Sequence, residues 1–185
     1  SSLNIIDVTS LYQNSIQGDR IVLDFFALFG VSAVFENDTL LLRKIKNFTF
    51  PKKIEWDFNN NPDLFPTFIV VCFALGVKLI ASGVKNLIYK ESDRIECVKK
   101  ELFKFNCNLV MKSSDCVFIQ SNSIQISNQV IPIDTHNDHR IALSFSPLAL
   151  LGYKLKINNI EVVSKSYPNF FADLTKFGVI IKDKL

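Results

Sequence analysis

Four polar segments of the sequence hold most of the residues that could do acid–base or anion-binding chemistry. They are residues 61–67, 86–95, 134–140 and 163–170. Each stands directly before an apolar or amphipathic stretch, where the pattern predicts that a helix begins. Because the first turn of a helix presents unpaired N–H groups and partial positive charge, such positions can bind anions.

Cationic residues stand at or beside three of these predicted helix starts, namely Arg94, Arg140 and Lys165. A cation at a helix N-terminus is unfavourable by about 0.3–1 kcal/mol, so its repetition favours a functional interpretation. Free N–H groups together with a guanidinium or ammonium group suit a multiply charged anion. Asp63 and Glu91 fall in the same segments and could move protons on that anion.

Each segment also has a purely structural interpretation. Asp63 stands where an N-cap would, with Pro66 in the first turn, and Ser166 and Pro168 have the same relationship. The charged residues 90–94 could form an exposed turn, since clustered charges usually face water. The recurrence of cations at three helix starts weakens these interpretations when the segments are taken together.

Both histidines, His136 and His139, lie in the third segment and are flanked by aspartates. Histidine and carboxylate are good metal ligands, but no third histidine or paired cysteine stands nearby. A dense polar loop that opens a buried helix is therefore a stronger interpretation of this segment than a metal site.

Composition limits the class of protein. With 185 residues, 48% of them apolar, and 17 phenylalanines, the chain can form one domain with a substantial core and is not disordered. A net charge of +3 fits small anionic ligands and gives no basic stripe for nucleic acid. The longest apolar stretch, residues 68–75, is far shorter than the ~20 residues of a membrane-spanning helix. The four cysteines lack CxxC spacing, and no signal peptide opens the chain, which favours a cytoplasmic protein with reduced thiols.

A long-period repeat predicts the elements that position these segments. Three helical runs end in the same way, at Phe29-Gly30, Phe105-Asn106 and Phe177-Gly178. Glycine and asparagine suit this position because they tolerate the left-handed backbone through which chains leave helices. The long interval between successive ends indicates a supersecondary unit repeated about three times.

Two of the repeats also have an earlier half with a strand, a helix that is apolar nearly all round, and another strand. The predicted fold class is therefore α/β (α+β), with repeated βαβαββ units, buried helices and outer sheets. We expect a single domain over residues 1–185 with repeats at about 1–50 (partial), 51–122 and 123–185. The chain starts without methionine, and its first repeat lacks the earlier half, so we expect an excised fragment. Pro147 falls inside one apolar helix and predicts a kink, at a cost of up to ~3 kcal/mol.

Five segments resemble, in order, motifs of the EPSP synthase family. Residues 90–95 (KESDRI) resemble its K-E-[ST]-D-R-[IL] signature, and residues 137–142 (NDHRIA) resemble its (N/D)-D-H-R-[MI]-A signature. Residues 165–171 (KSYPNFF) are similar to its K-[ST]-[FY]-P-x-[FY]-[FW] segment. Residues 62–63 (PD) and 14–19 (NSIQGD) resemble its [PA]-D and N-S-x-Q-G-D motifs. The matches extend over nearly the whole chain.

The resemblance implies a shikimate-pathway transferase that leads to chorismate and the aromatic amino acids. Its substrates would be phosphoenolpyruvate (PEP) and shikimate 3-phosphate, and phosphate would leave as the carboxyvinyl group is transferred. The resemblance implies no metal and no cofactor. Enzymes of this family have two similar domains of three βαβαββ units each, with the substrates between them. The chain is similar to the second domain only, so its partner would be the missing N-terminal domain of a monomeric enzyme, and the fragment alone would be inactive.

The resemblance also implies roles in proton transfer and in holding shikimate 3-phosphate. Asp63 would contact the shikimate ring hydroxyls and accept the proton of the attacking hydroxyl. Glu91 would exchange a proton with the methylene carbon of PEP. Asn86 and Lys90 would help to hold shikimate 3-phosphate.

Further residues would hold PEP. The resemblance implies that Arg94, Arg140 and Lys165 bind its carboxylate and phosphate, and that His139 supports the loop beside Arg140. The chain departs from the family at Ile88, where an arginine is usual, which puts one anion contact in doubt.

Two alternatives stay open. A carboxyvinyl transferase acting on a UDP-sugar would have the same fold, but the KESDR and NDHR segments favour the shikimate branch. A non-catalytic anion-binding domain could have kept the same loops.

Overall fold

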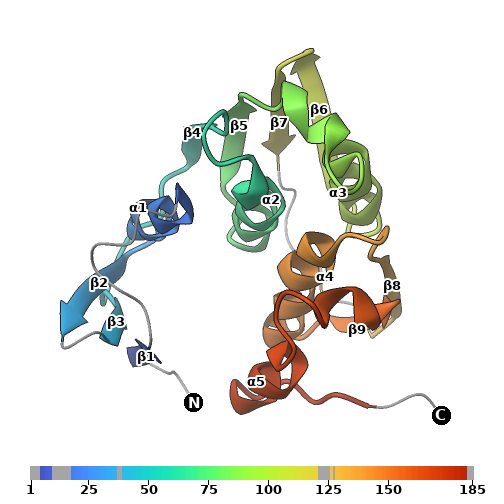
Figure 1. Cartoon of the computed structure of the whole chain (residues 1–185). Helices are drawn as coiled ribbons and strands as arrows, with labels where there is room; N and C mark the ends of the chain where they lie inside the picture. The colour runs from blue at the N-terminus through green and yellow to red at the C-terminus, as the bar shows by residue number, and fades with distance from the viewer. Residues whose placement is uncertain (1–4, 10–17, 37–38, 121–125, 127, 183–185) are drawn as a thin grey trace. The chain divides into compact units, whose positions relative to one another are not determined.

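The computed structural model describes residues 5–9, 18–36, 39–120, 126 and 128–182. Helices and strands are mixed along the chain, which confirms the predicted α/β class. The chain divides into two compact units, residues 1–52 and residues 53–185 (Figure 1). That residues 1–185 form a single domain stays a prediction.

The first unit combines a small antiparallel sheet with short helices. Its strand order is β1 (Ile5–Thr9), β3 (Thr39–Lys44), β2 (Val31–Glu36). Between β1 and β2 the chain forms the 3₁₀ helix η1 (Gly18–Ile21) and then α1 (Val22–Ala27).

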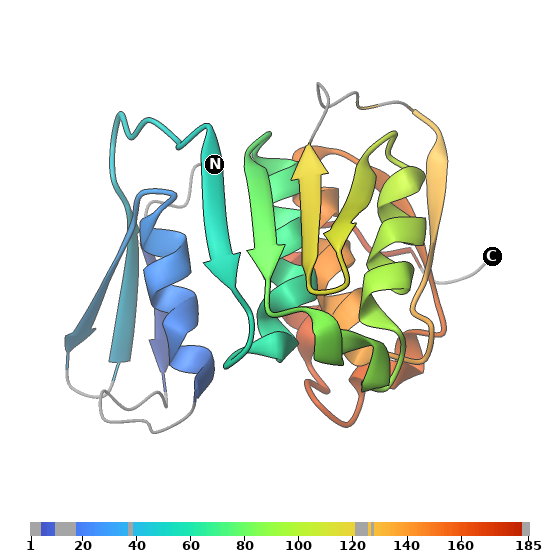
Figure 2. The same cartoon turned by 90° about the horizontal axis from the view of Figure 1, so that it is seen from above.

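The second unit begins with a four-stranded sheet, seen face-on in Figure 2. The strand order is β4 (Lys53–Asp57), β5 (Lys78–Ser82), β7 (Cys116–Gln120), β6 (Asn108–Ser113). β4 and β5 are parallel, whereas β7 runs antiparallel to both of its neighbours. The parallel pair requires a crossover connection, which a helix supplies.

Two helical segments connect these strands and carry the first two polar segments of the sequence. η2 (Pro62–Leu64) leads directly into α2 (Phe65–Ala74), between β4 and β5. η3 (Lys85–Tyr89) is followed by α3 (Arg94–Phe103), between β5 and β6. From β4 to β7 the order is therefore strand, helix, strand, helix, strand, strand.

The rest of the second unit has a parallel pair of strands and further helices. β8 (Val130–Asp134) pairs with β9 (Lys154–Asn158). Between them lie α4 (His139–Phe145) and the 3₁₀ helix η4 (Ser146–Leu151). η5 (Ile160–Val163) and α5 (Phe170–Lys176) follow β9.

The helices α2, α3 and α4 pack against one another in the interior of the second unit (Figure 1). No residue of α2 is exposed, as its apolar sequence predicts. One hydroxyl pair crosses this core, with Thr67 Oγ1 of α2 lying 3.0 Å from Ser144 Oγ of α4. The packing brings the N-terminal ends of these helices within side-chain reach of one another.

The predicted left-handed helix exits are confirmed. Gly30, Asn106 and Gly178 have φ angles of 73°, 57° and 98°. Each backbone N–H donates to the carbonyl three residues earlier, so the three helices end through the same local geometry.

Where the sequence predicted a kink at Pro147, the structure instead ends the α-helix just before it. α4 ends at Phe145, and the chain continues as a 3₁₀ helix with Pro147 near its start. Proline has no N–H with which to continue the α-helical ladder. Ser146 Oγ donates to the Ala142 carbonyl at 2.7 Å, which adds a side-chain bond at the break.

The four cysteines have free thiols, and three of them are buried. Burial raises the pKa of Cys72 to about 12 and that of Cys107 to about 11. These two thiols therefore stay protonated at neutral pH. Across the described ranges, no helix is long and apolar enough to span a bilayer.

Candidate anion-binding site

Asp63 lies in η2, and its carboxylate binds two arginines from later helices. Oδ1 accepts a hydrogen bond from Arg94 Nη1 at 2.5 Å, and Oδ2 accepts one from Arg140 Nη2 at 2.8 Å. The expectation that Asp63 caps a helix is wrong, because in the described chain no side chain caps η2 or α2. Pro66 does stand in the first turn of α2, as predicted.

Arg94, the first residue of α3, is completely buried and uses its whole guanidinium group. Nε donates to Asp138 Oδ2 at 2.8 Å, Nη1 donates to Asp63, and Nη2 donates to Glu91 Oε2. Its side chain is 0% exposed, whereas those of Asp63 and Glu91 are 35% and 50% exposed. Arg94 is thus a buried cation that forms ion pairs with the carboxylates of Asp63, Glu91 and Asp138.

The start of α3 is fixed by its own N-cap. The Asp93 carboxylate accepts a hydrogen bond from the Glu96 N–H at 3.0 Å, as in one half of a capping box. This cap fixes the start of the helix whose first residue is Arg94.

Asp138 is a further member of this cluster, to which we assigned no role from the sequence. It is fully buried and caps α4, since Oδ1 accepts from the Arg140 N–H at 2.9 Å. Its Oδ2 accepts from Arg94 Nε and from Ser92 Oγ at 3.1 Å. One carboxylate therefore fixes the starts of both α3 and α4. Its position directly before a predicted helix is the sequence feature that could have identified Asp138 as an N-cap.

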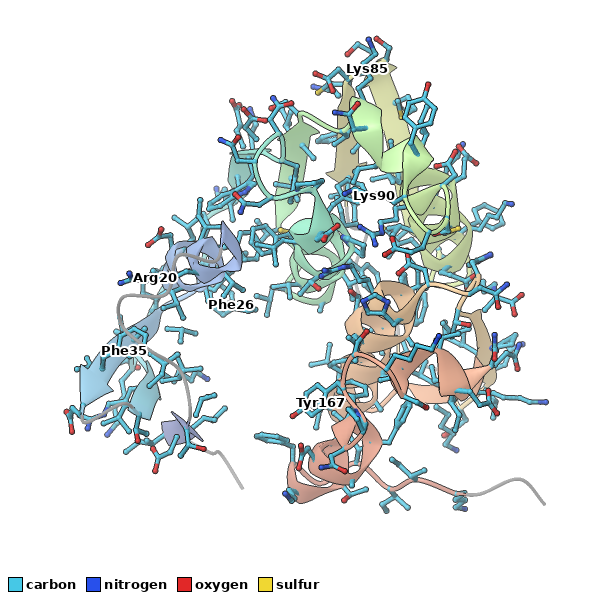
Figure 3. The ribbon with its side chains drawn as sticks, in the orientation of Figure 1. Arg20, Phe26, Phe35, Lys85, Lys90 and Tyr167 are labelled. Atoms are coloured by element: carbon cyan, nitrogen blue, oxygen red, sulfur yellow. The ribbon has the colours of Figure 1, made fainter. Side chains whose placement is uncertain are left out.

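Arg140 and Lys90 complete the cluster from the open side. Arg140 Nη1 donates to the Asp63 carbonyl at 3.3 Å, in addition to its carboxylate contact. Lys90 Nζ lies 3.5 Å from Asp63 Oδ1, between α2 and α3 in Figure 3. The side chains of Arg140 and Lys90 are 26% and 31% exposed, so these two cations are accessible from solvent, whereas Arg94 is not.

Charges in this cluster balance. The cations Lys90, Arg94 and Arg140 face three carboxylates, those of Asp63, Glu91 and Asp138. We call these six residues the Asp63 cluster.

The cluster shifts the acidity of its members. Partial burial by itself would raise the pKa of Asp63, but Arg94, Arg140 and Lys90 outweigh it and hold that pKa below its ordinary value. Burial would lower the pKa of Arg94, but hydrogen bonds to Asp138 and Asp63 raise it instead. Asp63 and Arg94 are therefore both ionised at neutral pH.

Three predicted site residues are not joined to this cluster. Within the described chain, no hydrogen bond or ion pair links the cluster to Asn86 in η3, His139 at the start of α4, or Lys165 after η5. Asn86 and Lys165 are exposed. Tyr167, close to Lys165 in sequence, lies beside α5 and apart from Lys90 (Figure 3).

The other structural interpretations can also be checked. Ser166 does not cap α5, whose N-cap residue is Asn169 without a side-chain bond, and Pro168 precedes the helix. Among the described residues, no group of three or more His, Cys, Asp or Glu could hold a metal ion. The fifth motif lies mostly outside the described residues, which resume at residue 18.

The comparisons with known proteins agree on one family. The family model for EPSP synthase (3-phosphoshikimate 1-carboxyvinyltransferase) matches residues 4–174. The chain belongs to the EPSP synthase family. This membership confirms the resemblance given by the sequence motifs.

Individual relatives are longer than this chain. A 3-phosphoshikimate 1-carboxyvinyltransferase from Bacteroides fragilis is 36% identical over 178 residues, which is 96% of this chain and 42% of that protein. The protein of the same name from Haemophilus ducreyi is 31% identical, over 92% of this chain and 38% of that protein. The chain thus spans about two-fifths of the length of these curated relatives and corresponds to one domain of such an enzyme.

A solved structure shows the same fold. The EPSP synthase from Acinetobacter baumannii superposes with a TM-score of 0.69 at 21% identity, over 96% of this chain and 42% of that one. This likeness concerns the fold alone.

Proposed function

We propose that this chain is the C-terminal domain of an enzyme that transfers the carboxyvinyl group of PEP to the 5-hydroxyl of shikimate 3-phosphate, with release of phosphate. Family membership and the length relative to the curated proteins support this proposal. Residues 53–120 would be one complete βαβαββ repeat, with β8 opening the next.

The Asp63 cluster is the observation that carries the proposal. Asp63 is an ionised carboxylate beside two partly exposed cations, Arg140 and Lys90, and a third cation, Arg94, lies buried behind it. An anion with carboxylate and phosphate groups would contact the exposed cations, while a hydroxyl beside it could lose a proton to Asp63. The cluster would thus supply both the anion contacts and the proton acceptor that carboxyvinyl transfer requires.

The balanced charge of the cluster explains why one domain would be insufficient. A doubly or triply charged anion placed on three cations that already pair with three carboxylates would leave excess negative charge. Further cations must come from elsewhere in the enzyme, and in this proposal the missing N-terminal domain supplies them. The isolated chain would then bind PEP weakly and would not turn over.

Two side chains, those of Asp63 and Glu91, would share the proton transfers of the chemical step. The 5-hydroxyl oxygen forms a bond to C2 of PEP and its proton passes to Asp63, while Glu91, after taking up a proton from solvent, passes that proton to the methylene carbon to give a tetrahedral intermediate. The methyl group then returns the proton to the Glu91 carboxylate, the C–O bond to phosphate breaks, and the double bond re-forms. Cations beside the phosphate stabilise it as it leaves.

Substrate binding would also change the pKa of Asp63, the proposed base. The cations that lower the pKa of Asp63 keep it ionised, but they make it a weak proton acceptor. Phosphate or carboxylate groups that bind Arg140 and Lys90 would offset their charge, so that the pKa of Asp63 rises towards the useful range. Asp63 would thus become a better base only when the anion is in place.

Lys165, Asn86 and His139 keep proposed roles from the family resemblance. Lys165 is exposed and forms no ion pair with the described residues, so it is available for the phosphate or carboxylate of PEP. Asn86 would contact shikimate 3-phosphate, and His139 would support the loop beside Arg140.

The test is an assay of the protein encoded by the complete reading frame. It should release phosphate from PEP only when shikimate 3-phosphate is present, whereas residues 1–185 alone should not. No release by a folded complete protein would favour the non-catalytic anion-binding domain instead. Turnover by the isolated chain would contradict the claim that half of the site is missing.

A further inference from the structure

A second buried carboxylate, Glu101, lies on α3 outside the Asp63 cluster. It is 1% exposed. It stands seven residues after Arg94, so the two side chains leave nearly the same face of the helix, about 10 Å apart along its axis. No sequence motif drew attention to it.

Glu101 binds the chain segment that leads from β8 into α4. Its Oε2 accepts from the Asp134 N–H at 3.1 Å, and its Oε1 lies 2.8 Å from His136 Nε2. Lys104 Nζ donates to Oε2 at 2.6 Å and to the Pro132 carbonyl at 3.0 Å. All three contacts of Glu101 are thus with groups that can donate a hydrogen bond, and two of them belong to one short segment.

This segment has a backbone that needs support. His136 and Asn137 are consecutive residues in the left-handed region, with φ angles of 52° and 58°. Non-glycine residues adopt that region at an energetic cost, so surrounding contacts must hold them there.

Asn159, after β9, supports the same segment from another element. Its Nδ2 donates to Asn137 Oδ1 at 2.7 Å, and its carbonyl accepts from Thr135 Oγ1 at 3.4 Å. Glu101 and Asn159 together therefore contact three consecutive residues of the turn, 135–137. The next residue is Asp138, whose N–H donates to the Thr135 carbonyl at 2.9 Å.

We propose that Glu101 is a positioning residue for the Asp63 cluster. By holding residues 134–136, it fixes the turn that delivers Asp138 to Arg94 and Arg140 to Asp63. α3 thus holds the start of α4 at two points, through Arg94 and Asp138 and through Glu101 two turns further on. The catalytic part of this inference rests on the proposed function, whereas its structural part does not.

The first experiment measures backbone hydrogen exchange in the complete protein carrying Glu101→Ala. The matched control is Glu96→Ala, which removes an exposed carboxylate paired with Lys99 on the same helix. We expect amides of residues 134–140 to exchange roughly fivefold to tenfold faster in Glu101→Ala, because hydrogen bonds that close the turn are lost. Exchange in α2 and β4 should match the control.

The second experiment measures steady-state kinetics of the same variants. Glu101→Ala should raise KM for PEP roughly tenfold, because Arg140 is no longer held beside Asp63, with KM for shikimate 3-phosphate within about twofold of the parent. Glu101→Gln keeps the shape and one acceptor oxygen, so it should recover part of the loss. A purely structural role would lower the amount of active enzyme and leave both KM values unchanged.

Three outcomes overturn the inference: unchanged KM for PEP in active Glu101→Ala enzyme, unchanged exchange at residues 134–140, or faster exchange spread evenly over the second unit. If Glu101→Ala does not fold, the hydrogen exchange of residues 134–140 in Glu101→Gln and in His136→Ala is compared with that in the Glu96→Ala control instead. If the parent protein shows no turnover, the proposed function fails, and the exchange pattern still decides whether Glu101 positions the turn.

Discussion

The Oδ1 atom of Asp63 lies 2.5 Å from Nη1 of Arg94, although one residue precedes α2 and the other begins α3. Oδ2 of the same carboxylate lies 2.8 Å from Nη2 of Arg140, at the start of α4. Three helix N-termini therefore meet at one carboxylate. A site of this kind depends on the packing of all three helices.

Asp63→Asn should abolish most turnover of the complete enzyme while leaving it folded. An amide cannot accept the hydroxyl proton, and removal of a general base typically lowers kcat by about 10²–10⁴-fold. The assay is phosphate release, with circular dichroism to confirm folding. Asp24→Asn, at an exposed aspartate of α1, is the matched control and should keep full activity. Activity of Asp63→Asn within twofold of the parent would remove Asp63 from the chemistry.

Arg94→Met should destabilise the second unit strongly. The substitution leaves Asp138 buried with its charge uncompensated, and breaking a buried ion pair in this way costs about 3–5 kcal/mol. Urea unfolding of the complete protein gives the change in unfolding free energy. Adding Asp138→Asn should recover part of it, because the unpaired charge is then removed as well. A loss below about 1 kcal/mol for Arg94→Met would show that Arg94 is not the centre of this network.

Low pH should remove the stability that the ionised Asp63 carboxylate contributes to the folded protein. The pKa of Asp63 is lowered in the folded protein, so its ionised form contributes stability that is present above the ordinary carboxylate pKa. That contribution is lost as the pH falls through the lowered folded value, below about pH 4. The difference in unfolding free energy between the parent and Asp63→Asn should therefore stay constant from about pH 6 to pH 5 and shrink as the pH falls below about pH 4. A difference that stays constant down to about pH 3 would contradict the assigned ion pairs.

The cysteines should differ sharply in reactivity. Cys72 and Cys107 are buried, and burial raises the pKa of their thiols to about 12 and about 11, whereas Cys116 is partly accessible. Alkylation follows the accessible thiolate, so iodoacetamide at pH 8 should label Cys116 first. Mass spectrometry of the native protein resolves the sites. Equal labelling of Cys72 and Cys116 without unfolding would contradict the burial described for α2.

Local features of the fold could be predicted from the sequence. The helix exits at Gly30, Asn106 and Gly178 depend on the conformational freedom of single residues, and Pro147 lacks an N–H in any context. The Asp93 cap likewise needs only its own helix. Such features are encoded within a few neighbouring residues.

Tertiary partners explain what could not be predicted. A cap and an ion-pair partner look alike in sequence at Asp63, and only the packing of α3 and α4 beside η2 decides between them. Asp138 and Glu101 were given no role because their partners, Arg94 and the turn before α4, are distant in sequence. The family resemblance supplied Asp63 and Glu91 as well as the two arginines, but it did not indicate that these carboxylates pair with the arginines.

The affinity for PEP is the most direct test of the central claim that the Asp63 cluster binds this anion. In the complete enzyme, Arg140→Ala should raise KM for PEP roughly 10- to 100-fold, because a charge-assisted contact contributes about 1.5–3 kcal/mol. Arg43→Ala, at an exposed arginine of β3, is the control and should leave KM unchanged. Equal KM values for both variants and the parent would show that the anion binds elsewhere.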